Sequence, residues 1–546
     1  METQEVKRHE AQPEDASSGQ ARQVSQADGA QEAAGRPDRV ATELEHVEYI
    51  WNAYDFLSPA AIDFAVNISG VPGRRTDRPF TYCDLGCGNA VSLNLLAACF
   101  PDSAFYGVDL SAQHIANGRA LAEAAGATNL TLVEGAFADL AERDPPQFDF
   151  IVAHGVLSWV NADAQKEILA FVERFLAPEG VLLITYNAAP GWARHVPVRE
   201  LLGSLADTRE GALDQRLRYA REALGHLSKL NLPYFSKTPD AAELIDMLRE
   251  KDLRYVAHEY LSDCWRPLHF SEVNDMFEGA GLRFCGTPDH QRRLQGASLR
   301  EVLKAVFPGA EHSPWPSAAD ENRTSLLLCE RFRRDIFCRP ELLERRQAEP
   351  QIDAWAPMAN MRAALNSVGQ RGGGHAADPK ILAACARGEA DLSALRKISD
   401  FAELGPEFDA RLSRLLADGA LQMFRRPVAA PAAVDRSGEA RYRLTNPFNR
   451  AGLEARRFKD DKIPLAAAPL GGPVELPTLP ALFTFGADSM PLSEIPAWAL
   501  SELRRVGAYH QGAPISETLV KAEFEAYLAS WLPICVTLDI LEPQEG

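Results

Sequence analysis

The chain has 546 residues, of which 46% are hydrophobic and 24% charged, and its formal net charge is -19. This length exceeds what one hydrophobic core organises, so we expect a multidomain globular protein. The acidic balance argues against a nucleic-acid partner, because that affinity comes largely from cations that neutralise phosphates. No run of 18 apolar residues predicts a membrane span, and the polar residues 1–8 predict no secretory signal. We therefore expect a cytoplasmic protein.

The nine cysteines are scattered and form no Cys-x-x-Cys pair, so we expect reduced thiols. His258, Glu259 and His269 lack the spacing of a zinc site, so no bound metal is expected. Residues 1–40 contain almost no large apolar side chains and predict a disordered tail.

The stretch that follows alternates short apolar strands with amphipathic helical segments, which is typical of a parallel α/β sheet. The strands are expected at residues 80–84, 104–109, 130–134, 148–153 and 181–186. Ile168, Val172 and Leu176 recur at helical spacing before the last of them. Two later stretches, 282–286 and 326–337, are expected to extend the same sheet.

Farther along, the pattern is helical from residue 197 to about 250, which predicts a helical insertion or layer. A glycine run at residues 371–374 predicts a flexible joint. A helical stripe at 412–416 followed by the strand-like residues 421–424 favours a winged-helix module. The expected domains are 41–200 for the Rossmann-like sheet, 201–345 for the helical region with returning strands, and 346–546 for an α+β, winged-helix-like region.

A glycine turn joins the first strand to its helix. Asp84, Gly86 and Gly88 lie in the run CDLGCGNA, where glycine lets backbone approach a ligand closely. The alternative is a tight turn without a ligand. Asp109 ends the next strand, where such folds bind ribose hydroxyls, although a carboxylate that merely caps the following helix is the alternative. Val91 stands where a dinucleotide fingerprint needs glycine, which favours a donor without phosphates.

These residues resemble those of bacterial class I methyltransferases with a methyltransferase regulatory domain, including the rickettsial protein-lysine methyltransferases. The likeness rests on residues 83–96, 105–111, 148–160, 186–192 and 258–270, and above all on the run HGVLSWV. The resemblance implies that the cofactor is S-adenosylmethionine. It also implies cofactor contacts at Asp84, Gly86, Cys87, Gly88, Asn89, Asp109, Leu110, Ala136, Phe137, His154 and Gly155. Two residues depart from the family pattern: Ala90 replaces the third glycine of the turn, and Ala136 stands where many members present a carboxylate to adenine. The missing carboxylate leaves adenine recognition to backbone groups or Asp139.

Methyl transfer mainly requires alignment of an uncharged nucleophile and exclusion of water. The candidate catalytic residues are His154, Trp159, Tyr186 and Asn187, with Ser158 beside them; Trp192, Tyr49 and Tyr54 are candidate aromatic walls. An aromatic wall suits an alkylammonium group. Each of these aromatic side chains could equally well be part of the hydrophobic core, and His154 could equally well be a structural histidine.

Three functions remain open. The first is N-methylation of lysine side chains in a protein substrate, the second is methylation of a small molecule or glycan, and the third is donor binding without turnover. The helical region is a candidate for forming a homodimer, as in the lysine-modifying relatives. A winged-helix shape would not imply DNA binding, given the acidic charge.

Overall fold

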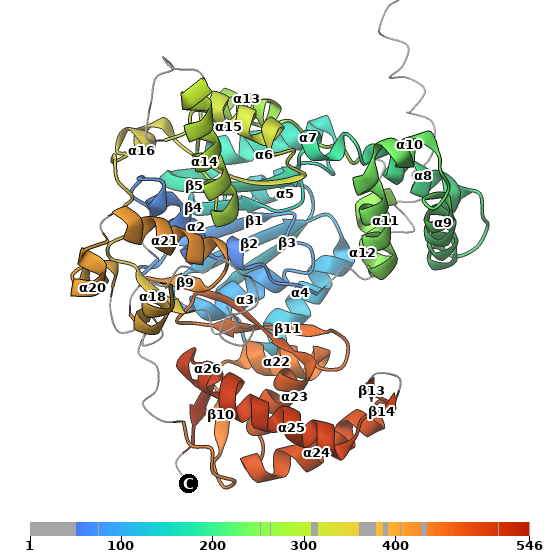
Figure 1. Ribbon diagram of the computed structural model, residues 1–546, viewed down its shortest axis with the longest axis vertical. Coiled ribbons are helices and arrows are strands. Elements are labelled where there is room, and N and C mark those ends of the chain that lie inside the picture. The colour runs from blue at the N-terminus through green and yellow to red at the C-terminus, as the bar shows by residue number, and fades with distance from the viewer. Residues whose placement is uncertain are drawn as a thin grey trace, which may run out of the picture.

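The computed structural model describes residues 51–544, apart from residues 75, 252, 262–263, 307–314, 360–377, 386–390, 405, 426, 429–433 and 511–512. Figure 1 shows a central sheet between helical layers, a helical lobe at one side and a C-terminal layer beyond α3 and α4. The predicted tail at 1–40, Tyr49 and the predicted joint at 371–374 lie outside the described residues.

Seven strands form the central sheet, in the order β3-β2-β1-β4-β5-β7-β6. They are β1 (Thr81–Leu85), β2 (Ala104–Asp109), β3 (Leu130–Glu134), β4 (Phe148–Ala153), β5 (Leu176–Asn187), β6 (Arg283–Gly286) and β7 (Phe332–Cys338). The first five strands are parallel, whereas β7 pairs antiparallel with both β5 and β6. The five predicted strands are confirmed, and both later stretches return to this sheet. The second starts only at Phe332, because the helix α15 (Ala318–Leu327) occupies the residues before it.

Side chains alternate between the two faces of the sheet and build two separate cores. On one face, Tyr82, Phe105 and Phe150 pack with helices α2 (Pro59–Ile68), α3 (Val91–Cys99) and α4 (Ala112–Ala124). On the other, Cys83 and Ile151 pack with α5 (Phe137–Glu142), α6 (Ala162–Phe175) and α13 (Phe270–Gly279). Helices on both faces confirm the predicted Rossmann-like α/β fold.

A helical lobe with its own core lies between β5 and α13. It contains α7 (Ala189–Trp192), α8 (Val196–Asp207), α9 (Leu213–Leu227), α10 (Pro233–Lys237), α11 (Pro239–Glu250) and α12 (Leu253–Leu261). Leu202, Leu217, Leu224 and Leu248 are buried in it, which confirms the predicted helical stretch. Farther along are α14 (His290–Val306) and α16 (Pro340–Glu344). None of the described helices combines the length and apolar composition that a membrane crossing requires.

The C-terminal region has two parts. The first contains β8 (Ala356–Ala359), α18 (Asp378–Cys385), α19 (Leu392–Leu395), α20 (Ser399–Ala402), α21 (Pro406–Ala417) and β9 (Leu421–Phe424), and its core includes Phe64 and Ile68 of α2. The predicted helix and strand at 412–424 exist. However, β9 pairs with the upstream β8, so the predicted winged-helix hairpin is not shown in the described part of the chain.

The second part packs on helices α3 and α4, which cover one face of the sheet. It comprises β10 (Tyr442–Leu444), α22 (Pro447–Arg456), β11 (Lys462–Ala467), β12 (Gly472–Pro477), α23 (Thr478–Ala487), α24 (Ile495–Arg505), β13 (Tyr509–His510), β14 (Ala513–Pro514), α25 (Glu517–Ala526), α26 (Leu532–Thr537) and β15 (Leu541–Pro543). The hairpin β11–β12 contacts α3, and the Ser58 hydroxyl donates to the Gly471 carbonyl at 2.6 Å. This packing fixes the chain just ahead of α2, where one wall of the site begins.

Candidate active site

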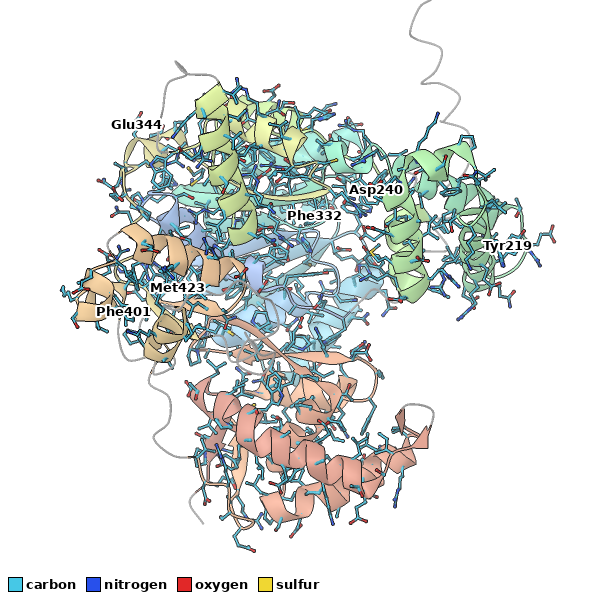
Figure 2. All side chains as sticks on the ribbon, in the orientation of Figure 1. Tyr219, Asp240, Phe332, Glu344, Phe401 and Met423 are labelled. Carbon is cyan, nitrogen blue, oxygen red and sulfur yellow. The ribbon has the colours of Figure 1, made fainter. Side chains whose placement is uncertain are left out.

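A cleft of about 710 Å³ opens at the carboxyl ends of β1, β2 and β4. This is the end of an open α/β sheet at which ligands bind. One side, which we call the glycine-turn half, comprises Asp84, residues 86–89, Asp109 and His114. The other side, the aromatic half, comprises Tyr54, Phe56, Trp159, Asn187, Trp192, Tyr255, Glu259 and Phe332. Figure 2 shows Phe332 near the middle of the molecule, between the sheet and the helical lobe that carries Asp240 and Tyr219.

The turn between β1 and α3 has the backbone that its glycines permit. Gly86 and Gly88 have φ values of 81° and 53°, and Ala90, which caps α3, has a φ of 52°. A Cβ atom at Gly86 would lie 2.5 Å from Val156 Cγ2, so a side chain there is excluded by space as well as by φ. At Gly88 no atom lies within 4 Å of that position, so the turn faces open space in the cleft.

Asp109 holds this turn in place. Its Oδ2 accepts a hydrogen bond from Gly88 N–H at 2.8 Å, and its Oδ1 accepts one from Ser111 N–H at 3.0 Å. Nδ1 of His114 lies 3.2 Å from the same Oδ1. The carboxylate therefore joins the ends of two strands and still lines the cleft, and the two interpretations of Asp109, cap and ligand contact, are compatible. An ionised carboxylate has about four acceptor positions.

Asp84 lies deeper, with only 5% of its surface exposed. Its Oδ1 has no hydrogen-bond partner among the described residues. Burial, reinforced by the nearby charge of Asp109, raises the pKa of Asp84 to about 7. A buried carboxylate without a partner is costly, and a cationic group of a ligand would offset that cost.

His154 lies at the end of β4, where the two halves meet. Its ring centroid is 4.4 Å from that of Tyr54 and 5.1 Å from that of Phe56. Nδ1 lies 2.8 Å from the Thr185 hydroxyl, which also accepts the N–H of Gly155 at 2.8 Å. Burial, together with Arg334, lowers the His154 pKa to about 4. The imidazole is therefore neutral at pH 7, and a pKa this low makes it a weak proton acceptor, which argues against its serving as the general base.

The aromatic half carries one carboxylate, that of Glu259 on α12. Burial raises its pKa to about 7. Tyr255 lies one turn earlier on the same helix face and also lines the cleft. Across from them, Asn187 Nδ2 has no hydrogen-bond partner among the described residues. Arg331 stacks on Trp192, with 5.0 Å between its Cζ and the ring centroid. This half thus combines aromatic faces, one carboxylate and one unsatisfied amide.

Twelve predicted site residues line the cleft together: Tyr54, Asp84, Gly86, Cys87, Gly88, Asn89, Asp109, His154, Gly155, Trp159, Asn187 and Trp192. Leu110, Ala136 and Phe137 do not belong to the lining; Leu110 is 76% exposed, and Ala136 N–H donates to Asp139 Oδ2 at the start of α5. Their predicted cofactor contacts stay predictions.

The prediction for Tyr186 is corrected by the structure. The side chain is fully buried, and its hydroxyl donates to Asp335 Oδ2 at 2.7 Å on the far side of β5 from Asn187. Ser158 is also buried, and its hydroxyl accepts the N–H of Asn187 at 3.0 Å. Both residues therefore support the neighbouring site residues and do not face the cleft.

Sequence reasoning missed Phe56, Tyr255, Arg331, Phe332 and Arg334, and weighed Glu259 only as a metal ligand. They come from three separated segments, so no local motif joins them. The one available signal was the four-residue spacing of Tyr255 and Glu259, which places both on one helix face.

Comparisons with known proteins match two parts of the chain to family models. Residues 83–182 match a methyltransferase domain, and residues 252–339 match the family described as a predicted methyltransferase regulatory domain. The second match includes Tyr255, Glu259, Phe332 and Arg334, so residues from both matched regions line the cleft.

Several relatives share these regions. An uncharacterized protein of Synechocystis sp. is 30% identical over 54% of this chain, and one of Rickettsia prowazekii is 33% identical over 33% of it. The chain covers 58% of the first relative and 72% of the second. A trans-aconitate 2-methyltransferase of Methylobacterium radiotolerans is 30% identical over 33% of this chain and 70% of its own.

Among solved structures, PKMT2 from Rickettsia typhi, in complex with AdoHcy, superposes with a TM-score of 0.71. The match covers 90% of this chain and 99% of that one at 20% identity, so the fold is shared almost throughout. The chain belongs to the class I S-adenosylmethionine-dependent methyltransferases that carry a methyltransferase regulatory domain.

Proposed function

We propose that this protein transfers a methyl group from S-adenosylmethionine to the side-chain amine of lysine in a protein substrate. The observation that carries the proposal is the aromatic half, where Glu259 lies among aromatic rings beside the donor turn. Aromatic faces attract an alkylammonium, and a carboxylate fixes its nitrogen. The resemblance to rickettsial protein-lysine methyltransferases and the shared fold with PKMT2 support this choice of substrate.

The glycine-turn half fits the donor. Asp109 has acceptor positions left for the two ribose hydroxyls, and Asp84 Oδ1 is the unpartnered acceptor that suits an α-ammonium group. The open space at Gly88 lets the backbone approach the donor closely. Bound S-adenosylmethionine supplies a methyl group on a positively charged sulfur.

The aromatic half prepares the acceptor. A lysine amine has an ordinary pKa near 10.4 and must lose a proton before its lone pair attacks. Glu259, whose pKa is raised to about 7, binds the ammonium as carboxylate and accepts that proton. A nitrogen–carbon bond then forms, the carbon–sulfur bond breaks, and the electron pair of that bond stays on sulfur.

The remaining wall residues act by position. Asn187 lines the cleft with an unpartnered amide Nδ2, which can donate a hydrogen bond to a carbonyl or carboxylate oxygen of a ligand, and Trp159 closes the cleft against water. His154, neutral at pH 7, is a positioning residue that holds Tyr54 and Phe56 through ring contacts. We also propose that Leu110, Ala136 and Phe137 contact the donor at its periphery.

The helical lobe is proposed to form a homodimer with a second copy of the chain. Light scattering, which measures the molar mass in solution, tests this proposal.

A second candidate is methylation of a small carboxylate-bearing molecule. Arg331 and Arg334 also line the cleft, and cations of this kind would pair with such a substrate. The similarity to trans-aconitate 2-methyltransferases supports this alternative. The lysine substrate is preferred because Arg334 is already paired with Asp289 at 3.1 Å and stacked on Phe56, whereas Glu259 has no ion pair among the described residues.

One experiment distinguishes these functions. Purified protein receives donor labelled in the methyl group and is offered a bacterial proteome, a metabolite extract containing di- and tricarboxylates, or neither. We expect label on lysine side chains, identified by peptide mass spectrometry. Label only in metabolites contradicts the proposal in favour of the second candidate, and donor binding without any transfer favours a non-catalytic regulatory protein.

A further inference from the structure

A second cavity, of about 210 Å³, lies between α14, the end of α2 and α21. It shares no lining residue with the cleft. Its wall includes Arg292, Arg293 and Arg300 on α14, the Glu321 carboxylate, which pairs with Arg292, and hydroxyl groups from Thr287 and Ser413. This is a small, polar and cationic cavity in a chain whose formal net charge is -19.

Within the described residues, neither Arg293 nor Arg300 forms an ion pair, although the charge of Arg300 is near enough to Asp320 to help lower the pKa of that carboxyl. Arg293 donates one long hydrogen bond, from Nη2 to the Ile68 carbonyl at 3.4 Å, and Arg300 has neither a hydrogen bond nor an ion pair within the described ranges. Arg292, their neighbour, differs: it forms ion pairs with Glu321 and Glu330. Arg292 thus has carboxylate partners, whereas Arg293 and Arg300 face the cavity without an ion pair among the described residues.

The environment of Arg293 makes this arrangement costly. Loss of hydration, together with the like charge of Arg300, lowers the Arg293 pKa to about 10, so the group stays cationic at pH 7 with unfavourable surroundings. A cation enclosed without a partner is expensive, and an anion brought into the cavity would offset that cost.

The cavity also has further donors for an anion, from the hydroxyl groups of its wall. The Thr287 hydroxyl accepts the N–H of Asp289 at 3.2 Å, which leaves its own hydrogen to donate. Guanidinium forks and hydroxyls are the groups that bind planar and tetrahedral oxyanions.

We propose that this cavity is a binding site for a small oxyanion, a phosphate or carboxylate group of a metabolite, with Arg293 and Arg300 as its counter-charges. The site is separate from the methyl-transfer cleft, so its occupancy does not depend on the function proposed above. Its volume is below that of ordinary drug-sized pockets, roughly 300–1,000 Å³, which limits the occupant to a small ligand.

Calorimetric titration of the full chain with inorganic phosphate, and separately with citrate, tests the proposal at constant ionic strength set with sodium chloride. We expect one of the two probes to bind with a Kd below about 1 mM. Arg293→Gln and Arg300→Gln should each weaken that binding at least about tenfold, the effect of losing about 1.4 kcal/mol. Lys304→Gln, which removes a charge from the same helix outside the cavity, should bind like the wild type.

The affinity for S-adenosylhomocysteine is the control for correct folding, and all three variants should retain it. If Arg293→Gln does not fold, Arg300→Gln alone tests the proposal. Absence of wild-type binding to both probes would overturn the proposal. So would an equal loss of binding in Lys304→Gln, because that result would indicate general charge attraction.

Discussion

The glycine-turn half of the cleft is built from one stretch of about 30 residues, whereas the aromatic half is assembled from five separated segments. Asp84, Gly86, Gly88 and Asp109 all lie at the ends of two adjacent strands, β1 and β2. Tyr54, Asn187 and Glu259 meet only because α12 and the start of β7 close over the sheet. A site made of consecutive strand ends can be predicted from sequence, and one made by tertiary closure cannot.

The two halves differ in electrostatics as well. The glycine-turn half holds two carboxylates, of which Asp109 is engaged by backbone N–H groups and Asp84 has a free oxygen. The aromatic half holds one carboxylate within reach of several rings. If the first half binds the donor and the second the acceptor, substitutions should separate donor affinity from turnover.

The largest effect is expected from Asp109→Ala. The change removes the ribose acceptor and the bond that holds Gly88 N–H. Donor affinity should fall about 100-fold, or about 2.7 kcal/mol, which lies within the roughly 1.5–3 kcal/mol that one hydrogen bond to a charged group contributes. Calorimetry with S-adenosylhomocysteine measures the effect, and Asp102→Ala, which removes an exposed carboxylate in the turn before β2, is the control. An unchanged donor affinity would contradict the assignment of Asp109 to the donor site.

Glu259→Gln should act on turnover alone. The variant keeps the side-chain shape but neither pairs with an ammonium nor accepts its proton. We therefore expect kcat to fall about 30-fold, somewhat less than the roughly 100- to 10,000-fold that general-base catalysis typically contributes. Donor affinity should stay within about twofold of the wild type, because Glu259 belongs to the aromatic half. A matching loss of donor affinity would contradict the division of the cleft.

The donor affinity should also depend on pH. Asp84 has its pKa raised to about 7 in the free protein, and the cationic donor favours its carboxylate form. Affinity is therefore full above pH 7 and is lost as the pH falls below it, by about tenfold between pH 8 and pH 6. Asp84→Asn should bind weakly at both values, without this slope. A wild-type slope of the opposite sign would rule out a donor cation at Asp84.

Tyr186→Phe should have the smallest effect on rate. The Tyr186 hydroxyl donates a hydrogen bond to Asp335, which Arg333 also contacts. Removing the hydroxyl leaves this buried carboxylate with one hydrogen bond fewer. We expect unfolding free energy to drop by about 1–2 kcal/mol, measured by urea denaturation, with kcat within about twofold of the wild type. A large fall in kcat with unchanged stability would restore the catalytic role predicted from sequence.

The error at Tyr186 shows where sequence analysis stops. The strand β5 was predicted correctly, and so was the presence of a site residue at its end. Alternate residues of a strand point to opposite faces, however, and apolar residues on both faces of β5 gave no sign of which one opens on the cleft. Asn187 faces the cleft, and Tyr186 faces an ion-pair cluster formed by α15 and β7.

The local periodicity of apolar residues was enough to predict the five parallel strands and the helical stretch of α8 to α11, because each of these elements is amphipathic or wholly buried. The pairing of β9 with β8 was not foreseen, since these strands lie more than 60 residues apart and pair only after folding. The same limit explains why Glu259 and Arg334, which line the cleft, were not singled out as substrate-facing residues.

The most direct test of the two-half cleft is a crystal structure of this protein with S-adenosylhomocysteine. We predict ribose hydroxyls on Asp109, the α-ammonium on Asp84, and sulfur pointing toward Asn187 and Glu259 in the aromatic half. A ligand bound elsewhere, or a sulfur atom directed away from Glu259, would contradict the account.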